Sequence, residues 1–253
     1  LSAIAVCSGK GSPGATFVAA NLAAALSRAN EETVLLDLDP AGGDLCCYLG
    51  LDPRRGLYPL LRMEGTISGT APLLTEAEER SGFRVVGGFP ESSDLASTGV
   101  LTGALAAAST SGRIVVADLG RVFETNAPIV AKCDLVLLVV RADLVSVLGA
   151  ERALRQLEAE GTRRERVTVV VSGHEKRRPA DLAEVGEALR LSVLGAVPLD
   201  RRGARKALLS QSPAATRRLR RAFDALSAAA RRSLAEVSAE REMPVPEFVE
   251  VRA

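Results

Sequence analysis

The segment from Ser8 to Thr16 reads Ser-Gly-Lys-Gly-Ser-Pro-Gly-Ala-Thr, and its spacing is typical of a loop that holds phosphate. The phosphate-binding template G-x-x-x-x-G-K-[ST] places two glycines, a lysine and a hydroxyl residue between a strand and a helix. Gly9 and Gly14 match the glycines, and Thr16 matches the hydroxyl residue that would bind Mg²⁺. Ala15 stands where the template has its lysine. The loop therefore predicts phosphate binding without the usual cation at that position.

Loss of this lysine affects binding and hydrolysis differently. Backbone N–H groups and the start of the following helix attract an anion, and the Ala15 methyl group leaves this cradle intact. A missing charge-assisted contact costs ~1.5–3 kcal/mol, which weakens binding about ten- to a hundredfold. Hydrolysis depends on positioning and charge neutralisation, so it suffers more. Pro13 also removes one N–H group from the loop. The loop is compatible with nucleotide binding but not with efficient turnover.

Two further acidic segments follow apolar runs. Residues 34–40 read VLLDLDP and residues 114–120 read IVVADLG, so each run ends in aspartate. In an open α/β sheet, ligands bind outside the carboxyl ends of the strands. Asp39 and Asp118 are therefore candidate site residues, and a helix cap or a turn is the structural alternative for each. Asp37 is expected to support the loop rather than to touch a ligand.

Apolar, β-branched runs alternate with helical stretches, which predicts an α/β fold with a doubly wound, mostly parallel sheet flanked by helices. Residues 1–242 are expected to form one domain, and residues 243–253 an extended tail with two prolines. Residues 53–81 are less regular and are predicted to form short helices over one edge. The predicted helices include residues 16–28, 144–160 and 179–189. The predicted strands are residues 3–7, 33–37, 83–87, 113–118, 134–140, 167–172 and 191–197.

The run from Lys10 to Thr16 resembles the K-G-G-x-G-K-[ST] loop of the MinD/ParA family of P-loop ATPases, and the two aspartate-bearing segments resemble that family's next landmarks. The resemblance implies ATP or ADP and Mg²⁺ as cofactors. It implies that Lys10 reaches across a nucleotide-dependent homodimer to the partner's phosphates, and that Asp39 orients the attacking water. Thr16 would bind Mg²⁺ directly, and Asp118 through water. The implied nucleotide contacts fall on Gly9, Lys10, Gly11, Ser12, Gly14, Ala15, Thr16, Phe17, Ser172, Pro198 and Asp200.

Several positions depart from the family pattern. Ala15 replaces the phosphate lysine, Phe17 replaces a hydroxyl residue that touches the α-phosphate, and Ala41 replaces a common glutamine. Ser172 stands where the family often has an asparagine that reads adenine. Two alternatives stay open as a result. The chain is either a nucleotide-gated switch with slow hydrolysis or a degenerate scaffold that acts through protein partners.

Residues 143–154 (DLVSVLGAERAL) and 191–210 (LSVLGAVPLDRRGARKALLS) resemble the TadZ/CpaE branch, whose members position Flp-type pilus machinery. This resemblance implies a localisation factor with partners in a pilus or cell-pole machinery, polar or membrane-associated through those partners. It also implies a receiver-like domain ahead of Leu1. Septum-site and partition ATPases would look similar, so a DNA-bound ATPase of that kind stays an alternative.

Composition argues against several classes of protein. A net charge of +1 gives no general affinity for polyanions, although residues 1–120 hold 8 basic and 13 acidic side chains and residues 121–253 hold 24 and 18. Four cysteines without C-x-x-C spacing and one histidine argue against a zinc site and favour a reducing cytoplasm. No apolar run reaches the length of a membrane-spanning helix.

The C-terminal stretch combines an apolar stripe with arginines. As a basic amphipathic helix it would lie on an anionic membrane, or its arginines would contact nucleic-acid phosphates. Alternatively, it is the last helix of the fold, docked by its stripe with the arginines in solvent. The alanine-rich, weakly apolar face favours docking. The stripe comprises Leu219, Ala222, Phe223, Leu226, Ala230 and Leu234, and the arginines are at positions 217, 218, 220, 221, 231 and 232.

Overall fold

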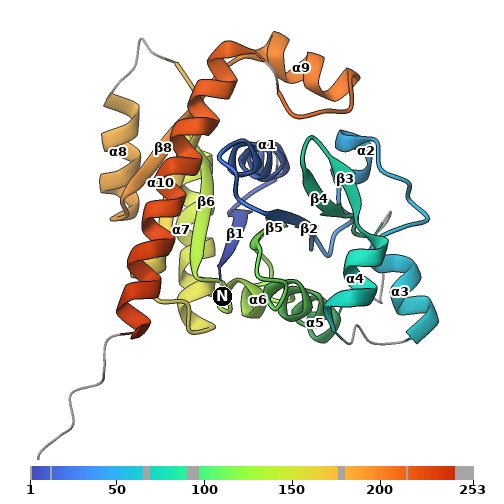
Figure 1. Ribbon diagram of the computed structural model, residues 1–253. Coiled ribbons are helices and arrows are strands. Elements are labelled where there is room, and N and C mark those ends of the chain that lie inside the picture. Colours follow the sequence, from blue (N-terminus) through green and yellow to red (C-terminus); the bar gives the residue numbers. More distant parts are fainter. Residues whose placement is uncertain are drawn as a thin grey trace, which may run out of the picture.

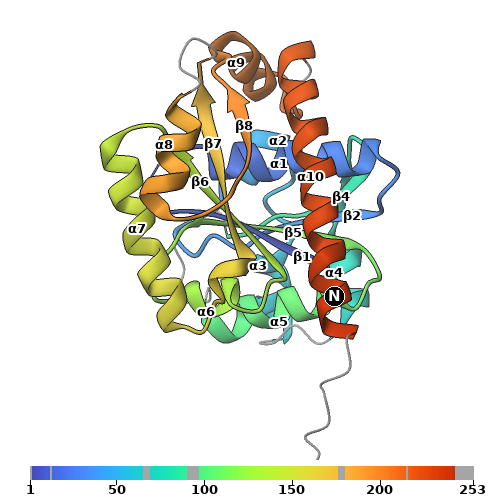
Figure 2. The ribbon, with the colours of Figure 1, turned by 90° about the vertical axis from the view of Figure 1, so that its left-hand side faces the viewer.

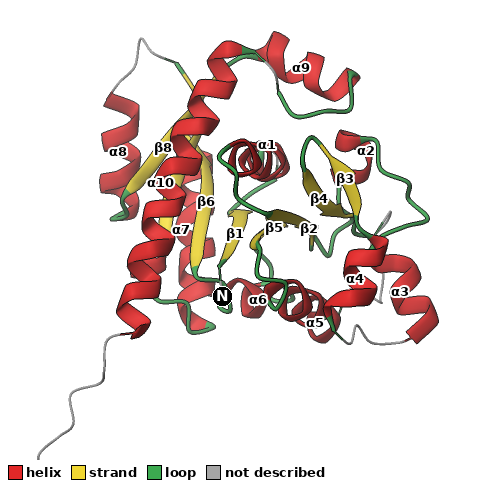
Figure 3. Cartoon of the chain, in the orientation of Figure 1, coloured by secondary structure: helices red, strands yellow, loops and turns green. Residues whose placement is uncertain are grey.

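A twisted sheet of eight strands forms the centre of the computed structural model, which describes residues 2–11, 13–64, 69–89, 97–175, 180–214 and 216–242 (Figures 1 and 3). The strand order is β3-β4-β2-β5-β1-β6-β7-β8. Only the β3–β4 pair is antiparallel among the strands of this sheet. The strands are β1 (Ala3–Ser8), β2 (Thr33–Asp37), β3 (Glu78–Arg80), β4 (Phe83–Val86), β5 (Ile114–Arg121), β6 (Leu135–Arg141), β7 (Val167–His174) and β8 (Val193–Pro198).

Helices cover both faces of this sheet (Figure 2). They bury two separate apolar clusters against it, one on each face. The first face carries α1 (Ala15–Arg28), α2 (Leu45–Leu49), α9 (Arg201–Leu209) and α10 (Arg217–Glu242). The second carries α3 (Leu57–Glu64), α4 (Thr70–Glu76), α5 (Thr98–Ser109), α6 (Ala127–Val130), α7 (Leu144–Ala159) and α8 (Ala180–Leu189). A short 3₁₀ turn, η1 (Arg164–Arg166), precedes β7. The doubly wound α/β fold is therefore confirmed.

The central strands have the composition that burial on both faces requires. Every residue of β1 and β2 is buried; β1 is apolar except for Ser8, and β2 is apolar except for Thr33 and Asp37 at its two ends. Against them, α1 buries a run of alanines between Ala19 and Ala25. Because alanine has only a methyl side chain, the helix axis lies close to the sheet. This packing fixes the start of α1 relative to the end of β1, where the candidate loop lies.

The predicted elements agree with the observed ones except at their ends and at one strand. Strand ends differ by one to three residues, and β5 continues past Asp118 to Arg121, which pairs with Ser8 of β1. Residues 53–81 were predicted to contain only short helices, and that prediction is wrong at Glu78–Arg80, which form β3. These three residues are all charged and show no apolar alternation. Pairing with β4, not local sequence preference, makes them a strand.

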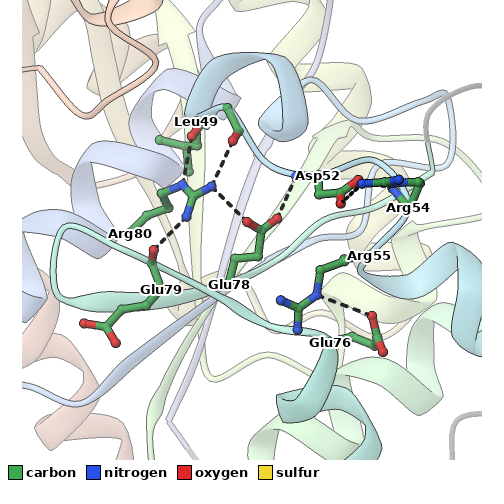
Figure 4. A network of polar contacts seen from close by, with 9 residues as sticks. Leu49, Asp52, Arg54, Arg55, Glu76, Glu78, Glu79 and Arg80 are labelled. Carbon is green, nitrogen blue, oxygen red and sulfur yellow. Dashed lines mark hydrogen bonds and ion pairs between the residues drawn. The ribbon is translucent and has the colours of Figure 1, made fainter.

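A network of polar contacts holds β3 and α2 together at this edge of the sheet (Figure 4). The Arg80 guanidinium donates to the carbonyl oxygens of Leu49 (3.2 Å) and Gly50 (2.9 Å), which end α2. It also donates to the Glu78 carboxylate at 2.8 Å. The other oxygen of Glu78 accepts from the Asp52 N–H group at 2.7 Å. One arginine therefore satisfies the free carbonyl end of a helix and pairs with an acid of the edge strand.

The C-terminal helix α10 is docked on the fold. Its apolar stripe is buried against α1 and β8, with Phe223 packed 5.7 Å from Phe17 between ring centroids. This confirms docking of the stripe over the membrane and nucleic-acid alternatives for that face. The tail expected at residues 243–253 lies outside the described residues. Within the described ranges, no helix combines the length and apolar character needed to cross a membrane.

Candidate functional site

The candidate loop lies at the carboxyl end of β1, the strand between β5 and β6. On one side, β2 and β5 are neighbours, and Asp37 at the end of β2 is directly paired in the strand register with Asp118 of β5. The loop and the aspartates therefore gather at one edge of the sheet, as the sequence predicts. Of the loop residues, Ser12 lies outside the described part of the chain.

Two glycines of the loop have a visible structural requirement. A Cβ atom on Gly9 would lie 2.1 Å from the Gly149 carbonyl oxygen and 2.4 Å from the Ala150 nitrogen, so the loop and α7 touch backbone to backbone. Gly14 precedes α1 with a φ of +97°, a left-handed conformation that side chains disfavour. A Cβ atom on Gly11, in contrast, would meet nothing within 4 Å. The glycines at both template positions are thus fixed by geometry.

The first turn of α1 supplies the remaining loop positions. Ala15 is only 6% exposed and packs in the apolar cluster of the first face. The Thr16 hydroxyl lies beside the Asp118 carboxylate. Phe17 points its ring away, edge-on to Tyr48 at 6.0 Å between centroids. Phe17 can therefore meet a ligand only through its N–H group, which belongs to the free donors of the helix start.

Asp37 is enclosed by backbone. Cβ atoms on Gly43 or Gly88 would lie 1.9 Å and 2.8 Å from its carboxylate group. The carboxylate accepts from the N–H groups of Leu45 (3.3 Å) and Asp39 (3.4 Å). Burial raises the pKa of Asp37 well above its ordinary value, and the nearby charge of Asp118 raises it further. These contacts give Asp37 the supporting position that the sequence predicts.

Asp118 carries an unpartnered oxygen at the centre of the site. Its Oδ1 accepts the Gly120 N–H at 3.2 Å, while Oδ2 is buried and has no hydrogen-bond partner in the described part of the chain. Burial raises the pKa of Asp118 to about 7, and the charges of Asp39 and Asp44 act in the same direction, while the Thr16 hydroxyl and the Gly120 N–H oppose them. A buried carboxylate oxygen beside a hydroxyl group fits Mg²⁺, which prefers oxygen ligands.

Asp39 lies over the same turn. Its Oδ1 accepts the Ala41 N–H at 2.9 Å, and a Cβ atom on Gly120 would come within 1.9 Å of its Oδ2. Burial raises the pKa of Asp39. In the described residues, no three or more His, Cys, Asp or Glu side chains form a complete metal cage. The residues present therefore fit a cation whose other ligands come from phosphate and water.

Lys10 is held by an acid that the sequence analysis missed. Its Nζ lies 3.9 Å from Oδ1 of Asp143, and Arg141 lies 3.6 Å from the other oxygen of the same carboxylate. Asp143 also accepts the Ser146 N–H at 2.8 Å, which caps α7. The available signal was that Asp143 follows β6, the strand beside β1. Sequence order alone does not show which strands are neighbours.

The remaining predicted contacts differ in how close they lie to the loop. Ser172, near the end of β7, has its Oγ 3.4 Å from where a Cβ atom on Gly14 would lie, so it adjoins the loop. Pro198 ends β8. Asp200 accepts from the Gly203 N–H and the Thr216 hydroxyl, both at 2.8 Å, and these bonds lower its pKa. Its carboxylate is engaged within the fold, and its nucleotide contact stays a prediction.

Solved structures share this fold. A ParA family ATPase from Chlorobium tepidum matches with a TM-score of 0.76 and 17% identity, over 89% of this chain and 98% of that one. A chain of the MinC:MinD cell division protein complex of Aquifex aeolicus matches with 0.72 and 17%, over 97% and 98%. The septum site-determining protein MinD of Pyrococcus horikoshii, complexed with Mg-ADP, matches with 0.72 and 17%, over 89% and 93%.

At these identities, the solved structures show the fold alone. No curated protein sequence matches the chain. The sequence model of the CobQ/CobB/MinD/ParA nucleotide binding domain matches residues 4–212, a range that includes the loop, both aspartate-bearing strand ends and the segments after β6 and β8. The chain therefore belongs to the CobQ/CobB/MinD/ParA nucleotide-binding domain family.

Proposed function

We propose that this chain binds Mg-ATP or Mg-ADP at the loop between β1 and α1 and hydrolyses ATP slowly or not at all. The proposal rests on the position of the Thr16 hydroxyl beside Asp118, whose Oδ2 is buried and has no hydrogen-bond partner among the described residues. Leaving such a group unpaired costs free energy, and a cation reached through water would relieve that cost. The P. horikoshii MinD complex with Mg-ADP supports the choice of ligand.

Each residue of the site has a separate role in this proposal. The N–H groups at the start of α1 bind phosphate, because they have no partners within the helix. The Thr16 hydroxyl and Asp118 hold Mg²⁺, which neutralises phosphate charge when bound. Asp39 orients the attacking water. Ala15 supplies no cation, so less of the charge that develops during phosphoryl transfer is neutralised. Binding survives this change better than hydrolysis does.

The proposal extends to assembly and location. Lys10 lies in a partly exposed ion pair with Asp143, and such pairs contribute little to stability. Its release would free it to contact the phosphates of a second protomer, which makes the dimer nucleotide-dependent. The resemblance to TadZ/CpaE proteins supports a role in placing pilus or cell-pole machinery through protein partners. The alternative is a scaffold that keeps these partner surfaces but binds no nucleotide, favoured by the burial of Ala15 among apolar side chains.

Calorimetric titration with Mg-ATP and Mg-ADP tests the site. The native chain should bind at micromolar to millimolar concentration, and Ala15→Lys should tighten binding about ten- to a hundredfold by restoring a charge-assisted contact. Thr16→Ala should weaken binding only when Mg²⁺ is present. Failure of the native chain to bind at millimolar ATP would refute the proposal and favour the scaffold, whether or not Ala15→Lys binds.

Light scattering after size-exclusion chromatography tests the dimer separately. The native chain should dimerise with Mg-ATP and stay monomeric without it. Lys10→Ala should bind nucleotide with similar affinity but remain monomeric. A Lys10→Ala protein that dimerises as the native chain does would refute the role of Lys10 without touching the binding proposal.

A further inference from the structure

Helix α9 and the first turns of α10 form a basic surface whose cations are not among the predicted nucleotide contacts. Residues 201–223 contain no aspartate or glutamate but eight lysines and arginines. All eight side chains are exposed, and none forms an ion pair with a carboxylate in the described ranges. We call this the α9 surface, comprising Arg201, Arg202, Arg205, Lys206, Leu208, Leu209, Arg217, Arg218, Arg220 and Arg221.

The two leucines face the same way as the cations of α9. Gly203 and Ala207, four residues apart, are buried against the protein and define the inner face of this helix. The outer face carries Arg201, then Arg205 four residues later, then Leu208 and Leu209 a further three and four residues on. Residues at these spacings lie on the same side of a helix. Leu208 is 52% exposed and Leu209 is 73% exposed. The outward face of α9 therefore combines two exposed leucines with cationic side chains.

Contacts within the fold join α9 and α10 into one surface. The Thr216 hydroxyl donates to Asp200 at 2.8 Å, which ties the start of α10 to the cap of α9. A Cβ atom on Gly203 would lie 2.9 Å from Cδ1 of Leu219, so the two helices are also in close apolar contact. Figures 1 and 2 both show α9 and this end of α10 together at the top of the molecule. The cations of both helices are therefore placed to contact one partner.

We propose that the α9 surface binds an anionic lipid bilayer, with Leu208 and Leu209 entering the boundary between headgroups and acyl chains. Each lysine or arginine near an anionic leaflet contributes ~1 kcal/mol, and buried apolar area adds to this. A nucleic-acid duplex would satisfy the charges but would give the leucines no apolar partner. This surface is separate from the apolar stripe of α10, which is buried inside the fold.

Co-sedimentation with lipid vesicles tests the proposal. The native chain should bind vesicles of phosphatidylcholine mixed with phosphatidylglycerol, and should not bind vesicles of phosphatidylcholine alone. Leu208→Ser with Leu209→Ser should weaken binding about tenfold, because the apolar part of the interaction is lost. Arg201→Glu with Arg205→Glu should weaken it at least tenfold, since two attractions to the anionic leaflet become repulsions.

Leu144 and Val145 provide a matched control. They are 73% and 61% exposed at the start of α7 and are not part of the α9 surface, so Leu144→Ser with Val145→Ser removes a similar apolar area. This variant should bind vesicles as the native chain does. All substituted residues are exposed. An unchanged unfolding midpoint in each variant confirms that the fold is retained, and the single variant Leu209→Ser serves the same purpose if a double variant is unstable.

Three results would overturn the proposal. The first is equal binding, or none, to neutral and anionic vesicles. The second is native vesicle binding by the double serine variant of α9. The third is a combined result, in which duplex DNA displaces the native chain from vesicles and the leucine variants bind DNA as tightly as the native chain does. That result would assign the surface to nucleic acid instead.

Discussion

At the scale of single residues, the candidate site depends on where side chains are absent. Gly9 meets the backbone of α7 at distances that no Cβ atom tolerates, whereas Gly11 faces open space. Gly9→Ala should therefore displace the loop or α7 and lower the free energy of unfolding by ~2 kcal/mol or more. Gly11→Ala is the matched control, and it should change stability by about 0.5 kcal/mol or less. Equal urea midpoints for the two variants would contradict the close backbone contact.

The buried carboxylate of Asp118 predicts an unusual dependence of stability on pH. Its pKa is about 7 in the folded protein and about 3.9 in the unfolded chain. Because the folded state holds the proton more tightly, this contribution to stability is complete below pH ~4 and is lost as the pH rises towards 7. Without Mg²⁺, Asp118→Asn should therefore be more stable than the native chain at pH 7.5, by ~2–4 kcal/mol, with little difference at pH 4.

Asp52→Asn is the control for this titration. The Asp52 carboxylate is hydrogen-bonded to Arg54, which lowers its pKa to about 2, so Asp52 is ionised across the range from pH 4 to 7. Its replacement should leave the pH slope of stability in that range unchanged. Thermal unfolding at a series of pH values measures both variants. A native-like slope in Asp118→Asn would show that this carboxylate does not carry the effect.

At the scale of elements, the contact between α2 and β3 depends on one arginine. Arg80 donates to two carbonyl oxygens at the end of α2 and to Glu78 (Figure 4). Arg80→Ala leaves these acceptors unpaired at a partly exposed site, which should cost ~1–2 kcal/mol in the free energy of unfolding. Arg54→Ala is the control, because the Arg54 side chain is 88% exposed. Urea unfolding should show a lower midpoint for the first variant alone, and equal midpoints would refute the role of Arg80.

The sequence predicts elements well where periodicity and burial agree. The strands that are buried on both faces are apolar runs in the sequence. The spacing of Leu219, Phe223 and Leu226 predicts the apolar stripe by which α10 docks on the fold. Prediction fails at β3, whose three charged residues form a strand only because β4 lies beside them. The basic surface of α9 is only partly visible in the sequence, which shows the cluster of cations in residues 201–221 but not the contact that joins α9 to the start of α10.

At the scale of the whole molecule, the strand order decides which residues can act together. Motif spacing is enough to predict that the loop and the aspartates meet at one edge, because parallel strands end at the same side of a sheet. It is not enough to predict the Lys10–Asp143 pair or the enclosure of Asp37 by Gly43 and Gly88. Those contacts depend on which strands are neighbours and on loops that return over the sheet. The family could therefore be inferred from the sequence, whereas the contacts that each site residue makes are seen only in the structure.

The contact between Gly9 and Gly149 also couples the position of the loop to the position of α7. A side chain can absorb a small displacement by changing rotamer, but neither glycine has one to change. Any shift of the loop would therefore displace the backbone of α7 directly. The first turns of α7 present Leu144, Val145 and Leu148 to solvent. A ligand held at the loop would in this way change the position of an apolar outer surface at the start of α7 without touching it.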